Sequence, residues 1–347
     1  MRDFLIIGQG IAGSVLGRLL EREGKSFHVV DGKQTPSASR VAAGVWNPIA
    51  VKRFSKTWLA DKTIPEAKAY FTAEESFFQD RFFFENQVIK LLSNQTEHKQ
   101  MIRRWEEMLP FVEQDDALEA APGVDAPNGI LRVKTAGYVD VTLFLDHIKT
   151  LWQQNGTLIE AHFEHDALQK VDDHWVWQNE AYRNVIFCEG VSGMKNPWLK
   201  NMPLENTKGQ VLELSIPELN TTHILNKHIF VLPQGNSIFR VGATNEWVFD
   251  DLMPSEAGKQ ELLEKLDKIL PGKHIEILHH YAGGRPTTTD RRPLMGALGE
   301  PGLFVFNGLG SRGVLLVPFL AGCMCRYLLG DKEAIPVDGR LQRLKHL

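Results

Sequence analysis

The stretch DFLIIGQGIAGSVLGRLLEREGKSFHVVD, residues 3–31, decides the fold of this chain. It starts with an apolar run, DFLII, which ends at a glycine and is typical of a buried parallel strand. Apolar residues then recur at helical spacing from Ile11 to Leu20, and Gly24 supplies a stop signal. A second apolar run, FHVVD, follows at 27–31. The stretch therefore predicts a strand–helix–strand unit with two parallel strands.

Within this stretch, GQGIAG at Gly8–Gly13 is a G-x-G-x-x-G motif between the expected strand and helix. Gly8 permits a tight turn, Gly10 lets backbone approach a pyrophosphate, and Gly13 permits close packing of helix on strand. The helix amino terminus adds unpaired N–H groups and the positive end of the helix dipole. Asp31 ends the second strand, where a carboxylate can bind ribose hydroxyls. The combination favours a dinucleotide site over a purely structural turn, and it leaves FAD and NAD as alternatives.

The rest of the chain shows helical and strand patterns without an internal repeat. We expect helices near 56–73, 97–109, 140–154 and 256–270 and from Val314 onward, buried strands at 184–190 and 303–307, a Phe-rich core segment at 77–92, an irregular stretch at 114–130, and antiparallel strands over 209–247. The predicted fold class is α/β, a Rossmann nucleotide-binding domain with an inserted substrate domain of antiparallel β-sheet plus helix. The first domain is discontinuous, formed by 1–75, 135–205 and 280–347, and the second is formed by 76–134 and 206–279.

The composition indicates a soluble globular protein. Of 347 residues, 43% are hydrophobic and 24% are charged. There are 39 basic and 43 acidic residues for a formal charge of −4, and Lys52, Arg53 and Lys56 form only a short basic cluster. A groove that follows nucleic-acid phosphates normally brings a surplus of basic residues. DNA or RNA is therefore not expected as a main partner.

The cysteines and the apolar runs indicate the compartment. Cys188, Cys323 and Cys325 are too few for a disulfide framework, and their spacing is not that of a zinc or thioredoxin motif. We interpret them as small buried side chains and expect no metal. No uncharged apolar run reaches the roughly 18 residues of a membrane span, and no basic leader precedes the apolar run at Phe4. These observations predict a soluble, cytoplasmic protein with no membrane span.

Two stretches near the carboxyl terminus carry candidate site residues. GLFVFNGLGSRGVLLVP at 302–318 is typical of a strand, a glycine turn and a helix, and its backbone N–H groups would stabilise negative charge on a reduced flavin ring. GGRPTTTDRRPLMG at 283–296 holds Arg285 between glycine and proline, where a guanidinium can bind a substrate carboxylate bidentately. The alternative for Arg285 is an ion pair with an acidic residue such as Asp290.

Further motifs follow in order along nearly the whole chain. SRVAAGVWNP at 39–48 has small residues that allow backbone close to a planar ring, although a plain surface loop is the alternative. AGYVD, IFCEG, KGQV, FVLP and VGATNEW come between it and the two carboxyl-terminal stretches. With this ordered set, the sequence resembles the FAD-dependent amine oxidoreductases of the D-amino acid oxidase, glycine oxidase and sarcosine oxidase superfamily. The resemblance implies a glutathione-reductase-like FAD domain.

The resemblance also implies a set of cofactor and substrate residues. FAD would be held by the glycine turns, the loop after the second strand and their neighbours, namely Gly8, Gly10, Ile11, Ala12, Gly13, Asp31, Gly32, Lys33, Ser39, Arg40, Ala43, Gly44, Val45, Trp46, Phe163, Glu189, Gly190, Arg285, Gly308, Leu309, Gly310, Ser311, Arg312, Gly313 and Val314. Arg285 would bind the substrate carboxylate, and the Ser311 carbonyl would accept the substrate amine. Asn47 and Phe230 complete the predicted catalytic site.

One departure from the family pattern concerns the substrate. D-amino acid oxidases carry tyrosines where this chain has Phe230 and Asn226, which puts a standard D-amino acid substrate in doubt. His228, Arg312 and Asn47 are candidates for replacing the lost polar contacts, with a surface or structural role as the alternative for each. Covalent attachment of the flavin is not expected, because both carboxyl-terminal cysteines fall inside the final helix.

The expected activity is oxidation of the CH–NH bond of a small amine or amino acid, with O₂ or another electron acceptor. One alternative is an enzyme that acts on a 2-hydroxy acid or on a modified tRNA base. Another is a flavin-binding protein without turnover.

We predict that the purified protein is yellow and releases intact FAD on acid or heat treatment. Asp31→Ala should weaken FAD binding by about 1.5–3 kcal/mol, because it removes a hydrogen bond to a charged group. Fluorescence titration of the apoprotein with FAD measures the change. A colourless protein that binds NAD but not FAD would contradict the family assignment.

Overall fold

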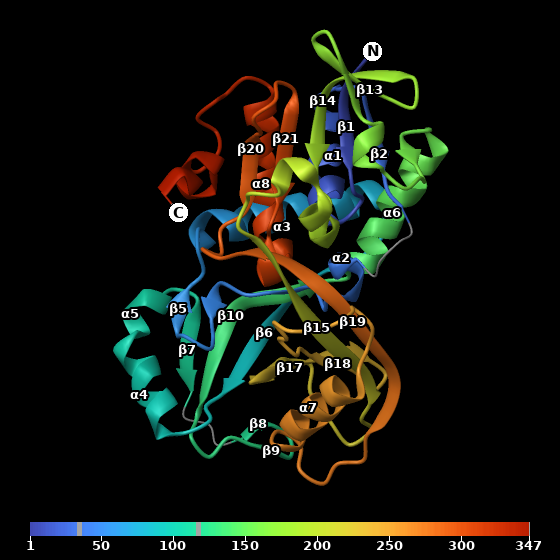
Figure 1. The fold of residues 1–347 in the computed structure, drawn as a ribbon. Helices are drawn as coiled ribbons and strands as arrows, with labels where there is room; N and C mark the ends of the chain where they lie inside the picture. Colours follow the sequence, from blue (N-terminus) through green and yellow to red (C-terminus); the bar gives the residue numbers. More distant parts are fainter. Residues whose placement is uncertain (33–36, 116–118, 347) are drawn as a thin grey trace.

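The computed structural model describes residues 1–32, 37–115 and 119–346. Two large sheets dominate it (Figure 1), one mostly parallel and one mostly antiparallel. The parallel sheet lies in the upper part of the view with most of the long helices, and the antiparallel sheet lies below it. The α/β fold class predicted from the sequence is confirmed.

The eight-stranded sheet has a parallel centre. Its parallel strands are β11 (Leu158–Ile159), β2 (Phe27–Val30), β1 (Arg2–Ile7), β14 (Glu180–Phe187) and β21 (Leu303–Asn307), in that spatial order. Antiparallel β12 (Gln169–Val171), β13 (His174–Trp177) and β20 (Leu294–Ala297) complete it. Strands from the start, middle and end of the chain thus pair side by side, and their carboxyl ends share one edge.

Three long helices pack on this sheet, namely α1 (Ile11–Arg22), α6 (Val141–Gln154) and α8 (Gly313–Leu328), and a fourth, α3 (Ala60–Phe78), packs on α8. The Asp140 side chain caps α6 by accepting a hydrogen bond from Leu143 N at 3.0 Å. Gly17 lets α1 approach α6, since a Cβ there would lie 2.7 Å from the Trp152 ring.

Helix α8 lies in the core between α1 and α3. The window from Gly310 to Leu328 is long and apolar enough to cross a membrane by length and composition alone. The sequence analysis excluded only uncharged runs, and this one includes Arg312 and Arg326. Because 56% of the window is buried inside the protein, we interpret it as a core helix.

The nine-stranded sheet forms the second unit. Its order is β19 (Glu276–Thr288), β15 (Leu204–Ser215), β18 (Ile238–Gly242), β17 (Ile229–Gly235), β16 (Ile224–Lys227), β6 (Phe83–Leu91), β10 (Ile130–Val139) and β3 (Val45–Trp46), with β7 (Val112–Asp115) paired to β10. Helix α7 (Glu256–Asp267) covers one face through Leu262 and Leu266. The short helices α4 (Gln95–Arg103) and α5 (Trp105–Met108) pack at the other side, through Met101 and Met108.

Some elements differ from the sequence expectations. The single helix expected at 97–109 is two, α4 and α5, and the irregular stretch 114–130 includes two short strands, β8 (Glu119–Ala121) and β9 (Val124–Asp125). Strands β10 and β19 run across the proposed domain boundaries at residues 134 and 279, and β3 comes from the first proposed segment. The remaining elements are α2 (Ala38–Val41) and the hairpin of β4 (Ile49–Ala50) and β5 (Ser55–Lys56).

The Phe-rich segment divides between two cores, although we expected it to lie mainly in the core of the inserted domain. Ile89 and Leu91 do pack in the core under α7, whereas Phe82 and Phe83 pack with the long helices. Phe83 stacks on Phe71 of α3 at 5.7 Å and on Trp46 of β3 at 5.4 Å between ring centres. Phe84 lies on the opposite face of β6 and stacks on Tyr138 at 4.6 Å. Phe83 therefore joins the antiparallel sheet to the helical core.

We predict that Phe83→Ala lowers the free energy of unfolding by about 3–5 kcal/mol, because it leaves a cavity between α3 and β3. Urea unfolding followed by circular dichroism measures the loss. Phe84→Ala is the matched control and should cost less, since Phe84 is only half-buried. Near-wild-type stability for Phe83→Ala, combined with lost substrate affinity, would instead assign this ring to a binding pocket.

Candidate active site

The turn between β1 and α1 is closed by backbone contacts that exclude side chains. Gly8 has φ +106°, and a Cβ there would lie 2.5 Å from the Cys188 carbonyl oxygen. A Cβ on Gly13 would overlap the Gly8 carbonyl oxygen. Gly10 is different, because its nearest neighbour would be Ser39 Oγ at 3.4 Å. The motif therefore packs tightly on the sheet side and has room at Gly10.

The amino terminus of α1 lies at this turn. No side chain of its capping residue, Gly10, is available, and Ser39 Oγ accepts the hydrogen bond from Ile11 N at 3.1 Å. Ile11 and Ala12 are buried. A helix end with unpaired N–H groups and positive dipole suits an anionic group such as a pyrophosphate.

Asp31 follows β2 and lies beside the same turn. Its Oδ1 accepts a hydrogen bond from Gln9 N at 2.9 Å. Burial raises the pKa of the Asp31 carboxyl, and the Gln9 hydrogen bond opposes that rise. Gly32 packs on the backbone after β11, since a Cβ there would lie 3.2 Å from the Ala161 carbonyl oxygen. Lys33, which the sequence analysis also assigned to the cofactor, lies outside the described residues.

Two further predicted cofactor residues, Phe163 and Glu189, have structural partners. Phe163 is buried in a cluster with Trp177 and Phe187. Glu189 accepts hydrogen bonds from His165 Nε2 at 2.8 Å and Asn196 Nδ2 at 2.7 Å. The hydrogen bond to the Glu189 carboxylate raises the pKa of the His165 imidazole. The Glu189 carboxylate is therefore engaged by the protein.

Asn307 is a residue that the sequence analysis missed. It is buried, donates to the Gly190 carbonyl at 2.9 Å and accepts from Gly308 N at 2.8 Å. It thereby joins the loops that follow β14 and β21. The sequence could have indicated Asn307, because it is a polar residue between the apolar strand and the glycine turn.

The turn after β21 forms a second glycine-rich helix start. Gly308 and Gly310 have φ of +72° and +62°. Ser311 is exposed, whereas Leu309 and Val314 pack in the helical core. A Cβ on Gly313 would lie 3.8 Å from the Ile11 side chain, so the amino termini of α1 and α8 are adjacent.

The loop at 39–48 supplies mainly backbone to this region. Ala43 is buried in an apolar cluster, and Gly44, with φ +68°, lies directly on the Val139 carbonyl of β10. Val45 and Trp46 form β3, and the Trp46 ring faces the core on Phe83. The Arg40 guanidinium binds Asp146 of α6 at 2.7 Å. The Arg40 side chain is therefore engaged in a partly exposed ion pair, and the Trp46 ring is engaged in packing.

Asn47 and Arg312 meet at the end of this loop. Asn47 Oδ1 accepts from Ile49 N at 2.8 Å, and the Asn47 carbonyl accepts from Arg312 Nη1 at 3.4 Å. Arg312 also donates to Thr57 Oγ1. Burial, and next the charge of Arg53, lower the pKa of Arg312 to about 10. Among the described residues, no carboxylate forms an ion pair with Arg312.

Arg285 lies flat on the backbone of the antiparallel sheet. Its guanidinium occupies the space where Gly209 would otherwise have a side chain. Nη1 donates to the Thr244 carbonyl at 3.1 Å and to Asn245 Oδ1 at 3.5 Å. Burial lowers the pKa of Arg285. The sequence analysis missed Thr244 and Asn245, although both belong to the VGATNEW motif.

The alternative role for Arg285, an ion pair with Asp290, is wrong. Asp290 is bound by Arg343 at 2.7 Å. No carboxylate in the described part of the chain forms an ion pair with Arg285, and Glu246 acts on it only from a greater distance.

Phe230 lies on the same face of the sheet as Arg285. A Cβ on Gly242 would lie 3.0 Å from the Phe230 ring, and the strand registers align Phe230, Gly242, Val211 and Tyr281 in one row. Side chains alternate along a strand, so Tyr281 and Arg285 share a face. Neighbouring Leu212 and Val231 pack toward α7 on the other face. Phe230 and Arg285 therefore face away from α7.

The other polar candidates differ in position. Asn226 is paired with Phe230, so it shares the face of Phe230 and Arg285. His228 occupies the turn between β16 and β17, with φ +65° and its Nε2 at 3.4 Å from Ser93 Oγ. His228 therefore contacts the segment after β6. Among the described contacts, none joins His228 to Arg285, so a role for His228 at the site has no support.

The arrangement fits FAD. Two adjacent helix amino termini, the open space at Gly10 and the ribose-binding candidate Asp31 lie at the carboxyl edge of the parallel sheet, where α/β folds bind ligands. The described residues contain no group of three or more His, Cys, Asp or Glu placed to hold a metal. The cysteines are unpaired and buried.

Comparison with known proteins supports this interpretation. A family model described as "DAO: FAD dependent oxidoreductase" matches residues 3–327. Among solved structures, glycine oxidase from Geobacillus kaustophilus superposes with a TM-score of 0.83 and 20% identity, covering 99% of this chain and 98% of that one. Iminodiacetate oxidase from Chelativorans sp. BNC1 has a TM-score of 0.80 and 21% identity, covering 96% and 97%. At these identities the structures show a shared fold.

Curated relatives are longer. The tRNA 5-methylaminomethyl-2-thiouridine biosynthesis bifunctional protein MnmC of Marinobacter nauticus is 25% identical over 91% of this chain and 54% of its own length. The bifunctional protein ThiO/ThiG of Nostoc sp. is 31% identical over 54% of this chain and 27% of its own length. The chain therefore spans about half, or less, of these relatives.

The expected identity of the cofactor and the enzyme class are confirmed. Because the family match includes both glycine turns, Asp31 and Arg285, and covers most of the sequence, the chain belongs to the DAO family of FAD-dependent oxidoreductases.

Proposed function

We propose that this protein oxidises the CH–NH bond of a small amine or amino acid that carries a carboxylate. The observation that carries the proposal is Arg285, a guanidinium with lowered pKa and no acidic ion-pair partner in the described part of the chain. The Arg285 side chain is half-buried, and a charge that is partly removed from water without a counter-charge lowers the stability of a fold. A substrate carboxylate would supply that counter-charge with two parallel hydrogen bonds.

The surrounding residues have distinct roles in this proposal. Thr244 and Asn245 hold one edge of the Arg285 guanidinium, and Gly209 lets it lie against the sheet. Phe230 supplies an apolar wall on the same face. The exposed turn residue Ser311 would accept a hydrogen bond from the substrate amine through its carbonyl.

Bound FAD supplies the two-electron acceptor for the substrate C–H bond. The amine becomes an imine, and water hydrolyses it. No protein base is required if the amine binds in its neutral form, so we assign none. The named activities of the structural neighbours, glycine oxidase and iminodiacetate oxidase, support an amine or amino acid substrate. We also propose a cytoplasmic location, supported by the three unpaired cysteines.

We predict that Arg285→Lys keeps fold and FAD but raises KM for the carboxylate substrate. Lysine retains the charge and loses the planar fork. Losing one hydrogen bond to a charged group costs about 1.5–3 kcal/mol, or roughly ten- to hundredfold in KM. Anaerobic flavin bleaching over D- and N-methyl amino acids and 2-hydroxy acids first identifies the substrate, and steady-state kinetics then measures the change.

Arg291→Lys is the matched control for this prediction. Arg291 is exposed in the turn after β19, and its replacement should leave KM unchanged. If Arg285→Lys leaves turnover unchanged while the melting temperature falls by several degrees, Arg285 is a structural residue. Bleaching by a 2-hydroxy acid and by no amine would replace the proposed reaction with hydroxy-acid oxidation.

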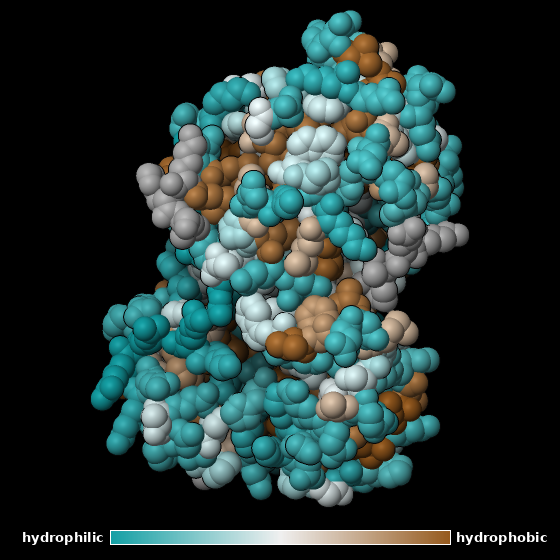
Figure 2. Space-filling view, viewed as in Figure 1, coloured by the Kyte–Doolittle hydropathy of each residue, from teal (hydrophilic) through white to brown (hydrophobic). Residues whose placement is uncertain are grey.

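A second candidate is action on a modified tRNA base, and a basic cluster favours it. Arg104 donates to the Arg53 carbonyl at 3.2 Å, Arg312 donates to Thr57, and the Arg292 guanidinium lies 4.8 Å from the centre of the Trp58 ring. Lys52 and Arg53 are exposed, and neither forms an ion pair among the described residues. Hydrophilic side chains dominate the surface over β5 and α5 (Figure 2). The segment 47–57, which carries Lys52 and Arg53 and which we call the basic loop, contacts Arg312 in the turn that begins α8.

For this second function we predict that the protein binds bulk tRNA and that a double Lys52→Glu, Arg53→Glu variant weakens binding at least about tenfold with a smaller salt dependence. Fluorescence anisotropy at several salt concentrations measures both. The double variant Lys195→Glu, Lys200→Glu makes the same charge change at exposed positions outside the basic loop and should bind like wild type. Equal loss in both variants, or no binding, would contradict a tRNA substrate.

A further inference from the structure

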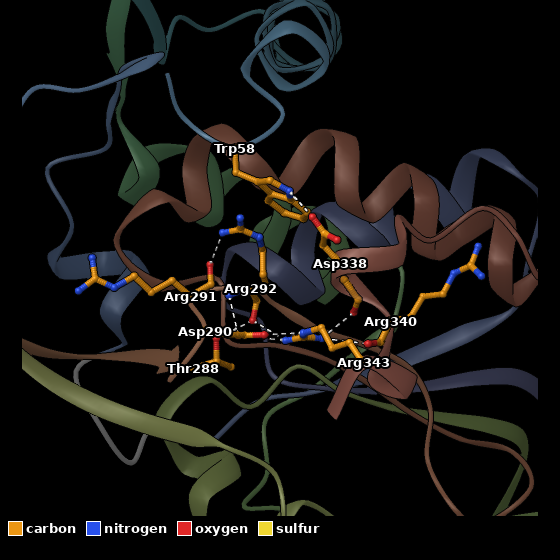
Figure 3. Close-up of polar contacts among 9 residues, drawn as sticks. Trp58, Thr288, Asp290, Arg291, Arg292, Asp338, Arg340 and Arg343 are labelled. Atoms are coloured by element: carbon orange, nitrogen blue, oxygen red, sulfur yellow. Dashed lines mark hydrogen bonds and ion pairs between the residues drawn. The ribbon is translucent and has the colours of Figure 1, made fainter. Parts of the chain in front are cut away.

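We propose that the ion pair between Asp290 and Arg343 positions both halves of the active site, the cofactor turn 308–312 and the substrate-binding Arg285. The substrate half of this inference rests on the function proposed above. The pair joins the turn after β19 to the carboxyl-terminal segment, 53 residues later in the chain (Figure 3).

The pair is bidentate and largely buried. Arg343 Nε and Nη2 donate to the two Asp290 oxygens at 2.7 and 3.3 Å, and the side chains are 12% and 24% exposed. Such fork-to-fork geometry is the strongest form of an arginine–carboxylate contact. Hydrogen bonds from Arg343 and from the Arg292 backbone hold the pKa of Asp290 below its usual value, against the effect of burial.

Arg343 is fully occupied by this one turn and its own segment. Nη2 also donates to the Arg292 carbonyl at 2.9 Å, and Nη1 donates to the carbonyls of Gly339 and Arg340 at 3.2 and 3.1 Å. Asp290 Oδ1 in turn accepts from Arg292 N at 3.0 Å. Arg343 therefore binds the turn at a side chain and at the backbone, which fixes its direction as well as its place.

The turn after β19 contacts the cofactor turn 308–312 directly. Thr288 is buried, and its hydroxyl donates to the Arg292 carbonyl at 2.6 Å, which closes the turn that Arg343 holds. The Thr288 methyl group lies against Gly308, where an added Cβ would be 3.1 Å away. Thr287 Oγ1 lies 3.5 Å from the corresponding position on Gly310. Both glycines of the cofactor turn thus rest on the end of β19.

The same strand end carries Arg285. Only Pro286 separates Arg285 from Thr287, so a shift of the strand end moves the guanidinium and the cofactor turn together. The neighbouring contact of Trp58 Nε1 with Asp338 at 3.3 Å attaches the carboxyl-terminal segment to the loop after β5 (Figure 3). The carboxyl-terminal segment is thereby held on the side of the molecule where Arg312 meets Thr57.

The test compares Arg343→Gln with Arg340→Gln, a matched control on the same segment. Arg340 donates to the Ile335 carbonyl at 2.8 Å and to Glu333 at 2.6 Å, so its side-chain bonds stay within its own segment. We expect Arg343→Gln to raise the Kd of the apoprotein for FAD about tenfold or more, and to raise the substrate KM roughly ten- to hundredfold through misplacement of Arg285. Arg340→Gln should lower the melting temperature and change neither constant.

Asp290→Asn and the double variant Asp290→Asn, Arg343→Gln complete a mutant cycle. The double variant should be no worse than either single variant in FAD affinity, because the two residues act as one unit. If Arg343→Gln does not fold, Arg343→Lys, which retains the charge and loses the fork, carries the same expectation with a smaller effect. Wild-type FAD affinity in folded Arg343 variants would overturn the proposal.

The two readouts separate this inference from the proposed function. FAD titration of the apoprotein requires no substrate, so it tests the cofactor half even if no amine is oxidised. A raised Kd for FAD with an unchanged substrate KM would show that the ion pair positions only the cofactor turn. That result would overturn the proposal that the pair also positions Arg285. Failure of every amine and amino acid to bleach the flavin, with FAD Kd raised as expected, would refute only the proposed function.

Discussion

The candidate site depends on the backbone contact between Gly13 and Gly8 and on that between Gly8 and Cys188. A side chain at Gly13 would overlap the Gly8 carbonyl, and one at Gly8 would lie 2.5 Å from the Cys188 carbonyl. These contacts hold the start of α1 at the carboxyl edge of the parallel sheet. Because β14 and β21 are parallel to β1, their following loops reach the same edge. The turn at Gly308 and the start of α8 then lie next to α1, and the cofactor residues from distant parts of the chain come together.

The arginines of the protein divide by their partners. Arg18 binds the fully buried Glu74 at 3.1 Å and Arg343 binds Asp290 at 2.7 Å, so each of these two guanidinium groups has a carboxylate. Arg285 and Arg312 instead donate to carbonyl, amide and hydroxyl oxygens, and burial lowers the pKa of each. Neutral acceptors orient a guanidinium without neutralising it. Both groups therefore retain their charge for a ligand, and both lie where the cofactor and substrate are expected.

Strand β19 connects parts of the protein that have different tasks. Along it, Gly283 packs on Val41 of α2, Arg285 faces the proposed substrate, and Thr288 supports Gly308. The turn that follows ends at Asp290, which Arg343 holds. Substrate binding, cofactor binding and the carboxyl-terminal segment are thus coupled through a few consecutive residues of one strand. A strand that couples these parts has to be rigid, and the long pairing of β19 with β15 makes it so.

The sequence by itself determined the strand–helix–strand opening, the dinucleotide turn and the α/β class, because these follow from local periodicity and from the spacing of the glycines along the chain. It also pointed to Arg285, through its place between glycine and proline. Tertiary structure alone decided the partners. Thr244 and Asn245 orient Arg285, Asp290 belongs to Arg343, Asn307 joins two loops, and Phe83 packs on the helices. Each of these contacts joins residues far apart in the chain or selects among several similar side chains. Only the packing of the sheets, which sets distances between such residues, makes that selection.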